Sequence, residues 1–280
     1  MEEFSVSTIV ATAGFVAGIF LGVIVSRTNF CTMGSLSDII FLEDYRRFRA
    51  WLLAMTVALI GTQSFQMAGV VDIYSSIYLG ANLGWAGAIV GGLMFGFGMT
   101  MAGGCANKNL IRIGGGNLKS LIVILVMGVF AYMTLRGLTG LVRVQLGSAT
   151  MVDLSGMGLK SQGLVDIIAA AIGSEAEAIR MTVTAVVALT LLFVIFKDKD
   201  FRNSPVNIIG GIGVGLIVPA GWWITGVLGA DEFDPTPLAS FSFVAPLQAD
   251  DGSDRHGNGS LEGIAGKPAS ISARGSAWRP

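Results

Sequence analysis

The chain has 280 residues, of which 52% are apolar and 13% are charged, and its formal net charge is −1. Its mean hydropathy of +0.69 excludes an ordinary soluble domain, in which about 25% of residues are charged. This balanced charge gives no reason to expect nucleic-acid binding. Two cysteines and one histidine are too few for a disulfide framework or a zinc site of four Cys or His ligands, so we expect no metal and no other cofactor.

Long apolar runs dominate the chain. A helix of about 20 residues crosses a hydrocarbon core of about 30 Å, whereas a membrane β-barrel needs alternating segments of about 10 residues. The runs do not alternate, so we predict an all-α, polytopic membrane protein in a lipid bilayer. Glu2 and Glu3 stand where a cleavable leader carries basic residues, so we expect the first run to remain in the mature chain. The runs cover about residues 8–26, 50–71, 83–103, 118–135, 181–196 and 206–228.

The segments around these runs differ in character. Residues 27–49 are expected to form a polar connection with a serine-rich turn at 34–37. Residues 163–173 are apolar but too short to cross the membrane, which predicts a re-entrant or interfacial helix. The last run contains Pro219 and many glycines, so we predict a kinked or broken helix there.

Basic residues are concentrated at one end of the predicted bundle, although the segment between the fourth and fifth runs also carries Arg136, Arg143, Lys160 and Arg180. Those at this end follow the first, third and fifth runs, whereas residues 72–82, between the second and third runs, contain none. Because Lys and Arg favour the cytoplasmic side, the pattern predicts a multi-pass protein with a periplasmic N-terminus. The residues concerned are Arg27, Arg46, Arg47, Arg49, Lys108, Arg112, Lys119, Lys197, Lys199 and Arg202.

A unit of glycine and cysteine recurs along the chain. When Cys31 is aligned on Cys105, the glycine pairs that precede the two thiols fall in register, and a third copy has Ile224 in place of the thiol. Glycine pairs four apart also occur as simple packing faces in membrane helices. Transporters are often built from such repeats, with the substrate site at their interface. The three glycine units are GIFLG at 18–22, GLMFG at 92–96 and GIGVG at 211–215.

Both thiols lie where an apolar run breaks into glycines and amides. A cysteine in apolar sequence is usually a small hydrophobic residue. Unwound backbone at membrane depth, however, is tolerated only where it is buried in protein or lines a cavity. We therefore predict that the two thiols and their neighbours line a path through the protein. The predicted path residues are Asn29, Cys31, Gly103, Gly104, Cys105, Asn107, Lys108, Asn109 and Arg112.

The residue types at this path suit a soft, sulfur-containing anion. A protonated thiol is a weak donor and a polarisable contact, and we expect both thiols to be protonated because a thiolate would repel an anion. A short helix that begins near Asn107 would add backbone N–H groups and a favourable dipole. Lys108 and Arg112 either concentrate anions at the mouth of the path or act as topological signals at the end of a span.

The segments FVAGIFLGVIVSRTNFCTMGSLSDI and GFGMTMAGGCANKNLIRIGGGNLKSL resemble the two first-half motifs of the YeeE/YedE family of bacterial inner-membrane transporters of sulfur compounds. The resemblance covers residues 8–247. It implies pseudo-symmetric halves with short re-entrant helices, and uptake of thiosulfate or a related anion rather than an enzyme activity. It further implies that Cys31 and Cys105 are two of the protonated cysteines of a central pathway. The implied partner is a cytoplasmic sulfur-carrier protein of the TusA type.

The chain departs from the family pattern towards its C-terminus. The family's second half ends with another glycine and cysteine unit, which supplies a third pathway cysteine that this chain lacks. After residue 247 the composition changes abruptly to Gly, Ser, Ala and charged residues, which cannot form a span. We expect residues 1–247 to form a membrane domain with an incomplete second half. Residues 248–280 would be a disordered tail or the product of a truncated or frame-shifted reading, and the abrupt change favours the second explanation.

Two other functions remain open at this point. Cys31 and Cys105 would form the redox pair of a membrane thiol protein, although the chain has no CxxC motif and no histidine beside the thiols. The chain would otherwise be a membrane subunit with no pathway of its own.

Overall fold

The computed structural model describes residues 6–76, 79, 82–154, 159, 161–173, 176–230 and 238–241. These residues are predominantly helical, and their only strands are the two-residue pair β1 (Asn82–Leu83) and β2 (Val152–Asp153). The helices are α1 (Val6–Thr28), α2 (Thr32–Leu42), α3 (Arg46–Met67), α4 (Trp85–Met101), α5 (Ala106–Gly114), α6 (Leu118–Arg136), α7 (Leu138–Thr150), α8 (Leu164–Ile172), α9 (Ala176–Phe196), α10 (Lys199–Arg202) and α11 (Pro205–Trp223), with a 3₁₀ turn η1 (Ile73–Ser75) and a π-helical turn η3 (Ile224–Leu228).

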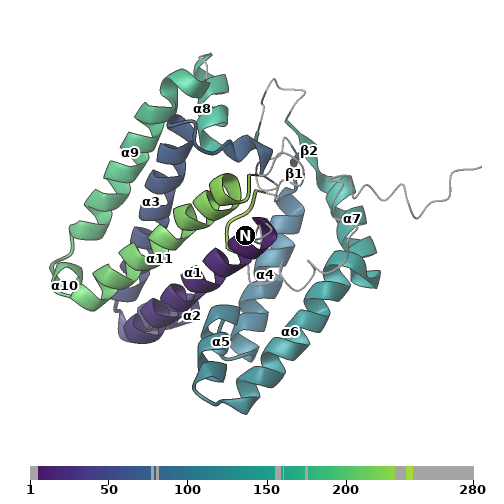
Figure 1. Ribbon diagram of the computed structural model, residues 1–280, viewed down its shortest axis with the longest axis vertical. Coiled ribbons are helices and arrows are strands. Elements are labelled where there is room, and N and C mark those ends of the chain that lie inside the picture. The colour runs from purple at the N-terminus through teal and green to yellow at the C-terminus, as the bar shows by residue number, and fades with distance from the viewer. Residues whose placement is uncertain are drawn as a thin grey trace, which may run out of the picture.

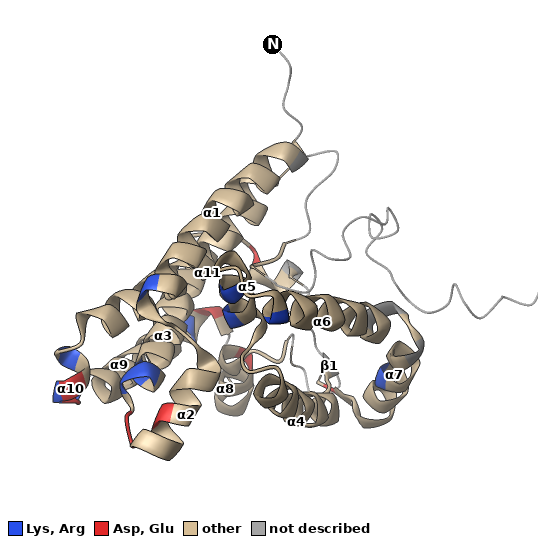
Figure 2. Ribbon diagram, turned by 90° about the horizontal axis from the view of Figure 1, so that it is seen from below, with Lys and Arg blue, Asp and Glu red and all other residues tan. Residues whose placement is uncertain are grey.

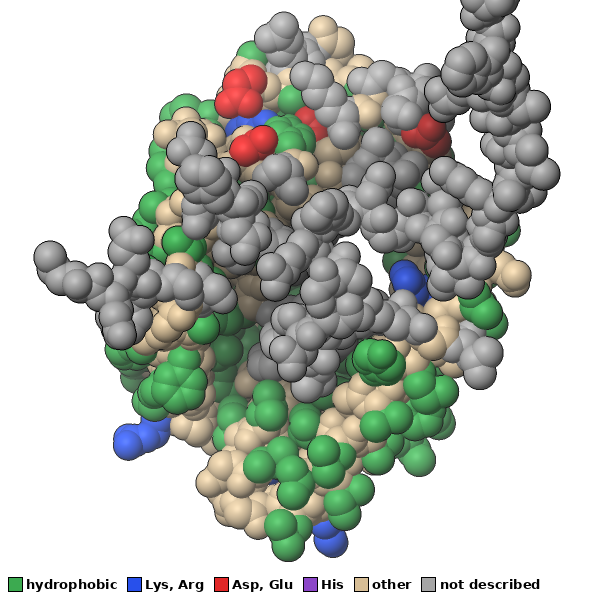
Figure 3. Space-filling model, turned by 45° about the vertical axis from the view of Figure 1, so that its right-hand side comes forward, with side chains coloured by type: hydrophobic (Ala, Val, Ile, Leu, Met, Phe, Trp, Pro, Cys, Tyr) green, Lys and Arg blue, Asp and Glu red, His purple; other side chains and the backbone are tan. Residues whose placement is uncertain are grey.

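The predicted polytopic all-α membrane fold is confirmed. Five helical stretches of the described chain are long and apolar enough to cross a membrane, and the pair α6 and α7, bent by 53°, would make a sixth. Large hydrophobic side chains remain exposed along these helices, for example Phe97 at 70% and Leu118 at 73%. Figure 3 shows such side chains spread over one face of the molecule. This exposure suits helices that face lipid, because a bilayer solvates apolar surface.

The helices form two groups that lie side by side (Figure 1). In one group α11 packs between α1 and α3, and α9 packs on the other flank of α3. In the other group α6 contacts α5 and α7, and α4 contacts α7. The buried core of the first group lies near one end of α3, around Ala50, Leu53, Ile195 and Phe201. The two groups meet where α1 contacts α5.

Glycines let α11 approach its neighbours closely. A Cβ atom added at Gly211 would lie 2.7 Å from the carbonyl oxygen of Ala50, and one at Gly215 would lie 2.7 Å from that of Ala54. A backbone carbonyl cannot move aside as a flexible side chain can. The third glycine unit is therefore a packing face that needs glycine, in the manner of small-residue faces in membrane helices.

The corresponding glycines of α1 and α4 are not packed in this way. No described residue lies within 4 Å of a Cβ atom added at Gly18 or Gly22 of α1, or at Gly92 or Gly96 of α4. The first and second glycine units thus present open small-residue faces among the described residues.

Three expectations about local structure need correction. Residues 27–49 are not merely a polar connection, because they include the helix α2. No helix was predicted between the run at 118–135 and the short segment at 163–173, where the structure has the helix α7. Of the kinked or broken helix predicted at Pro219, the break is absent, because α11 continues through Pro219 and widens into the π-helical turn η3, and the kink stays a prediction.

Neighbouring groups account for the tolerance of Pro219 within a helix. The Pro219 ring packs on Gly61 of α3, where a Cβ atom would lie 2.7 Å from Pro219 Cγ. Hydroxyl groups supply further bonds to carbonyls of this stretch: Ser240 Oγ donates to Val218 O at 3.2 Å, and Thr225 Oγ1 donates to Gly221 O at 3.0 Å. These bonds do not replace the one that Pro219 cannot make, which would go to Gly215 O, but they fasten the neighbouring turns, and a local π turn is one of the adjustments with which membrane helices tolerate proline.

The short helices α5 and α8 match the expected short helical segments near Asn107 and at 163–173. Residues 242–280 lie outside the described residues, so the proposed boundary at residue 247 and the nature of the tail stay predictions.

Candidate functional site

Two broken helices carry the two cysteines in the same way. The helix α1 ends at Thr28, Asn29 adopts a left-handed φ of 52°, and Cys31 caps the N-terminus of α2 in extended conformation. The helix α4 ends at Met101, Gly103 adopts a left-handed φ of 66°, and Cys105 caps α5 in extended conformation. The left-handed residue stands two positions before the thiol in both units. The repeat inferred from the sequence is therefore also a repeat of backbone geometry.

The third glycine unit does not share this geometry. The position that corresponds to the thiol, Ile224, follows Trp223 in helical conformation without a left-handed residue between the two elements. The absence of a thiol and the absence of a break thus occur together in this copy, which serves as a packing helix.

The fold brings the two thiols into contact. Cys31 and Cys105 are hydrogen-bonding partners, and both are free and half-exposed. Cys31 Sγ also accepts the backbone N–H of Gly34 at 3.4 Å. Cys105 likewise lies within reach of the backbone N–H groups of Asn107 and Lys108, so either sulfur can donate its S–H to the other.

Lys108 joins the two units beside the thiols. Its ammonium Nζ donates to Asn29 Oδ1 at 3.1 Å, which links α5 to the break after α1. Its stem lies over Gly104, where an added Cβ atom would be 3.2 Å from Lys108 Cβ. Gly104 has a φ of 153°, which also favours glycine. The positive charge of Lys108 also interacts electrostatically with Cys31, which belongs to the other cysteine unit. Lys108 therefore lies at the thiol pair itself.

Two residues of the predicted path turn away from it. Asn109 is only 2% exposed, and its Nδ2 donates to the carbonyls of Gly104 and Cys105 at 3.0 and 3.3 Å. Arg112 Nη1 donates to the carbonyl of Gly103 at 2.8 Å. Asn107 lies half-buried in the first turn of α5. The structure thus gathers Asn29, Cys31, Gly104, Cys105 and Lys108, and directs Asn109 and Arg112 onto the backbone behind Cys105.

The electrostatics at the thiols favour an anion. The N-termini of α2 and α5 both begin at a thiol, and neither helix has an acidic residue in its first turn. The partial positive charge of both helix ends therefore adds to the charge of Lys108. Basic residues also cluster at and around α5 in Figure 2.

A second polar cluster lies at the other end of α3 and α9. Arg180 is only 5% exposed. Its guanidinium donates to the Tyr74 hydroxyl at 2.7 Å, and that hydroxyl donates to Asp166 Oδ1 at 2.9 Å. The Ser161 hydroxyl also donates to Asp166, and Glu177 pairs with Arg180 at 3.2 Å. The cluster borders a cavity of about 240 Å³. Sequence reasoning missed it, although charges beside apolar helices at 166 and 180 were the available signal.

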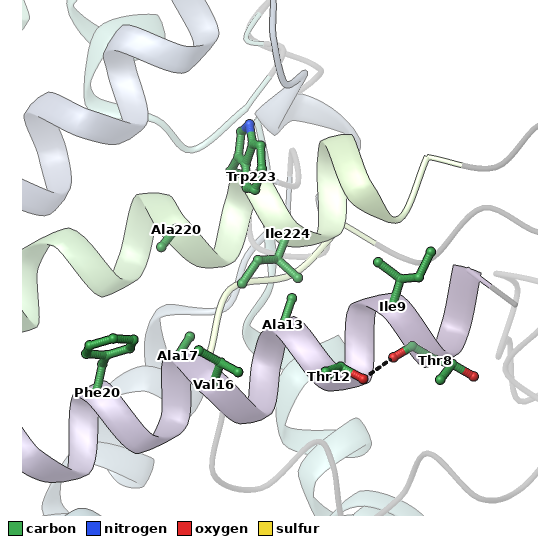
Figure 4. A pocket seen from close by; sticks show the side chains of 10 residues that line it. All are labelled: Thr8, Ile9, Thr12, Ala13, Val16, Ala17, Phe20, Ala220, Trp223 and Ile224. Atoms are coloured by element: carbon green, nitrogen blue, oxygen red, sulfur yellow. Dashed lines mark hydrogen bonds between the residues drawn. The ribbon is translucent and has the colours of Figure 1, made fainter. Parts of the chain in front are cut away.

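An apolar groove of about 660 Å³ separates α1 from the end of α11 (Figure 4). Alanines 13 and 17 of α1 face Ala220 and Ile224 across it, and Thr8 and Thr12 are the only hydroxyl-bearing residues among its described lining. Thr12 Oγ1 already donates to the Thr8 carbonyl at 2.7 Å. The groove offers an anion no charge, in contrast to the thiol pair. Across the described residues, no group of three His, Cys, Asp or Glu side chains comes together to hold a metal.

Comparison with known proteins supplies the family. A family model described as sulphur transport matches residues 27–249, which include both thiols and all of α2 to α11. The chain belongs to this family. It is 32% identical over 123 residues to the thiosulfate transporter TsuA of Escherichia coli (strain K12), and 27% identical over 124 residues to the thiosulfate transporter TsuA of Spirochaeta thermophila. It is 31% identical over 97 residues to the probable transporter YedE of Escherichia coli.

These alignments cover only part of this chain and only part of each relative. They cover 44%, 44% and 34% of this chain, and 32%, 36% and 22% of the respective relatives. The chain thus spans about a third or less of the length of the curated relatives it matches. The resemblance to the family inferred from the motifs is confirmed, and the chain is a multi-pass membrane protein.

Proposed function

We propose that the chain takes part in the uptake of thiosulfate or a related sulfur-containing anion, and that the anion passes the contact between Cys31 and Cys105. The observation that carries the proposal is the meeting of two free thiols at two converging helix N-termini beside one lysine. Membership of the sulphur-transport family and the names of the relatives support the class of substrate.

The chemistry of the pair fits an anion with both a soft and a hard end. A thiol S–H is a weak donor that a polarisable sulfur atom can accept from. Backbone N–H groups at the starts of α2 and α5, together with Lys108, offer stronger donors to oxygen atoms. An S–H that one sulfur donates to the other stays available, because an approaching anion can replace the second sulfur as its acceptor. Weak donors also release the anion readily, as conduction requires.

Further parts of the proposal concern the setting of the pathway. We place the chain in the bacterial inner membrane with its N-terminus in the periplasm, since the basic residues follow the first, third and fifth predicted runs. A sulfur-carrier protein of the TusA type in the cytoplasm would then receive the anion on the side where α10 and the α2–α3 turn lie. This orientation can be tested by introducing a cysteine at either end of α1 and treating intact cells with a membrane-impermeant maleimide. Only the cysteine at the periplasmic, N-terminal end should react.

Uptake of radiolabelled thiosulfate in cells that lack their own importers tests the proposed function. Cells that express the chain should accumulate label, and Cys105→Ala should reduce accumulation to background because the S–H donor is lost. Cys105→Ser retains a donor and should keep part of the uptake. Leu110→Ala, on the exposed face of α5, is the matched control and should leave uptake unchanged. Normal uptake by Cys105→Ala at normal protein level would remove the thiols from the pathway.

The contact between the thiols also favours a second function, in which Cys31 and Cys105 act as a redox pair. Reactive cysteines are found at helix N-termini and beside lysines, and both features are present here. Mass analysis of the chain from native membranes separates the two functions. A predominant Cys31–Cys105 disulfide would favour the redox function, and two free thiols in actively transporting cells would favour the pathway.

A further inference from the structure

We infer that Asn109 and Arg112 are positioning residues, which brace the broken backbone before α5 so that the Cys105 thiol meets Cys31. They would not touch the transported anion. The inference rests on the proposed function only for its effect on uptake, since the placement of the thiol can be measured without transport.

Asn109 holds two consecutive carbonyls of the break. Its Nδ2 donates to Gly104 O at 3.0 Å and to Cys105 O at 3.3 Å, and the side chain is 2% exposed. Since both carbonyls only accept, the amide must present its NH₂ group to them. Its oxygen meets no donor among the described residues. The contribution of Asn109 therefore comes from the two bonds that fix the backbone on either side of the Cys105 Cα atom.

Arg112 holds the carbonyl just before these two. Its Nη1 donates to Gly103 O at 2.8 Å, and a Cβ atom added at Gly103 would lie 3.5 Å from the same nitrogen. Residues three apart lie on one face of a helix, so Asn109 and Arg112 approach the break from the same side of α5. Three successive carbonyls, those of residues 103, 104 and 105, thus each receive a side-chain donor from one short helix.

The first cysteine unit lacks this brace. The positions that correspond to Asn109 and Arg112 are Ser35 and Asp38. Ser35 Oγ donates to Thr32 O inside α2, and Asp38 pairs with Arg47 at 3.3 Å. Neither interaction reaches the break at residues 29–31. The brace is thus particular to the second unit.

The backbone of the two breaks explains the difference. The second break contains Gly103 and Gly104, both with positive φ, whereas the first contains Asn29 and Phe30. Two consecutive glycines have more conformational freedom to lose than the pair in the first break. Side-chain bonds to each carbonyl restrict that freedom, and they hold the Cys105 thiol beside Cys31. We expect the thiols to separate when the brace is removed.

Disulfide formation in membranes that contain the full chain measures this placement. Diamide takes two electrons and two protons from Cys31 and Cys105, which join through a new S–S bond while the N=N bond of diamide becomes a hydrazine. Thiols that remain free are counted with a maleimide that adds mass. Asn109→Leu and Arg112→Met should slow cross-linking about tenfold, because each removes donors that hold the break. Arg112→Lys keeps a donor and should restore part of the rate.

Leu110→Ala is again the matched control, because Leu110 lies on the exposed face of the same helix and has no polar side chain to bond residues 103–105. It should cross-link at the rate of the unaltered chain. Wild-type cross-linking rates in Asn109→Leu and Arg112→Met would overturn the inference, and so would lost uptake in these variants with an unchanged rate. If Asn109→Leu fails to accumulate in the membrane, the inference is tested with Arg112→Met and Arg112→Lys alone, because Arg112 is half-exposed and its substitution is better tolerated. Failure of uptake by the unaltered chain would count against the proposed function. The cross-linking rates would still show whether Asn109 and Arg112 position the Cys105 thiol.

Discussion

The three glycine units of this chain have the same spacing but different surroundings. In α11 the glycines at 211 and 215 face the carbonyls of Ala50 and Ala54 on α3, with no room for a methyl group. In α1 and α4 the corresponding glycines face no described residue within 4 Å. The unit that is packed is also the one that has neither a thiol nor a break. The two units with open faces carry the thiol pair.

This difference separates two uses of glycine in a membrane helix. In α11 glycine permits close contact between helices, since its missing side chain leaves space for a neighbouring backbone. At Gly103 and Gly104, glycine permits positive φ and a turn at the end of a helix. A glycine pair in the sequence indicates that one of these uses applies, but only the neighbouring chain shows which. Substitutions in the packed and open faces can test this comparison.

The largest effect is expected at the packed face. Gly215→Ala places a methyl carbon about where the Ala54 carbonyl lies, so α11 and α3 must move apart at a loss of about 1–3 kcal/mol in the free energy of unfolding. Unfolding titrations of the purified chain in mixed detergent micelles measure the loss. Gly14→Ala, at an open position of α1, is the matched control. An equal result at both positions would contradict the assignment of α11 as the tightly packed helix.

A smaller effect is expected at the polar cluster, which holds the opposite end of α3 by hydrogen bonds instead of glycine contacts. Tyr74→Phe removes the hydroxyl that joins Arg180 to Asp166, which should cost about 1–2 kcal/mol because both buried charges lose a partner. The same unfolding titration measures it. A neutral Tyr74→Phe would show that the cluster contributes little to holding α8 and η1 on the bundle.

Tyr74 also predicts a dependence on pH. Burial, with a further contribution from the charge of Asp166, raises the pKa of the Tyr74 phenol above its ordinary value. The folded state therefore prefers the neutral phenol, so the contribution is complete below the ordinary phenol pKa of about 10 and is lost as the pH rises through the folded-state pKa. Unfolding midpoints of the unaltered chain should fall over this alkaline range, and those of Tyr74→Phe should fall less. Identical profiles would exclude Tyr74 as the group responsible.

The smallest effect is expected at the open faces. Gly18→Ala adds a methyl group where no described residue lies within 4 Å, and alanine favours a helix over glycine by up to about 1 kcal/mol. The free energy of unfolding should stay the same or rise slightly. A marked loss of stability in this variant would show that the α1 face is in contact with another part of the protein, and so would remove the contrast with α11.

Much of the organisation of the chain was predictable from its residues. The apolar runs correspond to the long helices within a few residues, since a stretch of about 20 apolar residues has few other stable forms in a bilayer. The register of Cys31 with Cys105 correctly indicated a shared structural unit, down to the left-handed residue before each thiol. Less predictable were α2 and α7, whose serines, glycines and charges gave no clear apolar period.

In the candidate site, too, some features were predictable from the residues and others were not. Residue types alone marked Cys105 and its polar neighbours as a working region, because thiol, amide and ammonium groups rarely follow an apolar span by chance. They did not show that Asn109 and Arg112 turn back to the carbonyls of residues 103–105, since both an exposed path and an internal brace suit an amide and a guanidinium. The cluster around Arg180 was missed because its members come from four separate segments.

The sequence by itself determined the class of the protein, the approximate position of its spans and the pairing of its two cysteine units. Each of these depends on local composition or on spacing along the chain, which bilayer thickness and backbone geometry translate directly into structure. Only the tertiary structure decided which glycine face is filled, that the thiols touch, and that Lys108 bridges to Asn29. These are contacts between distant segments, and they depend on which helices the rest of the fold places side by side.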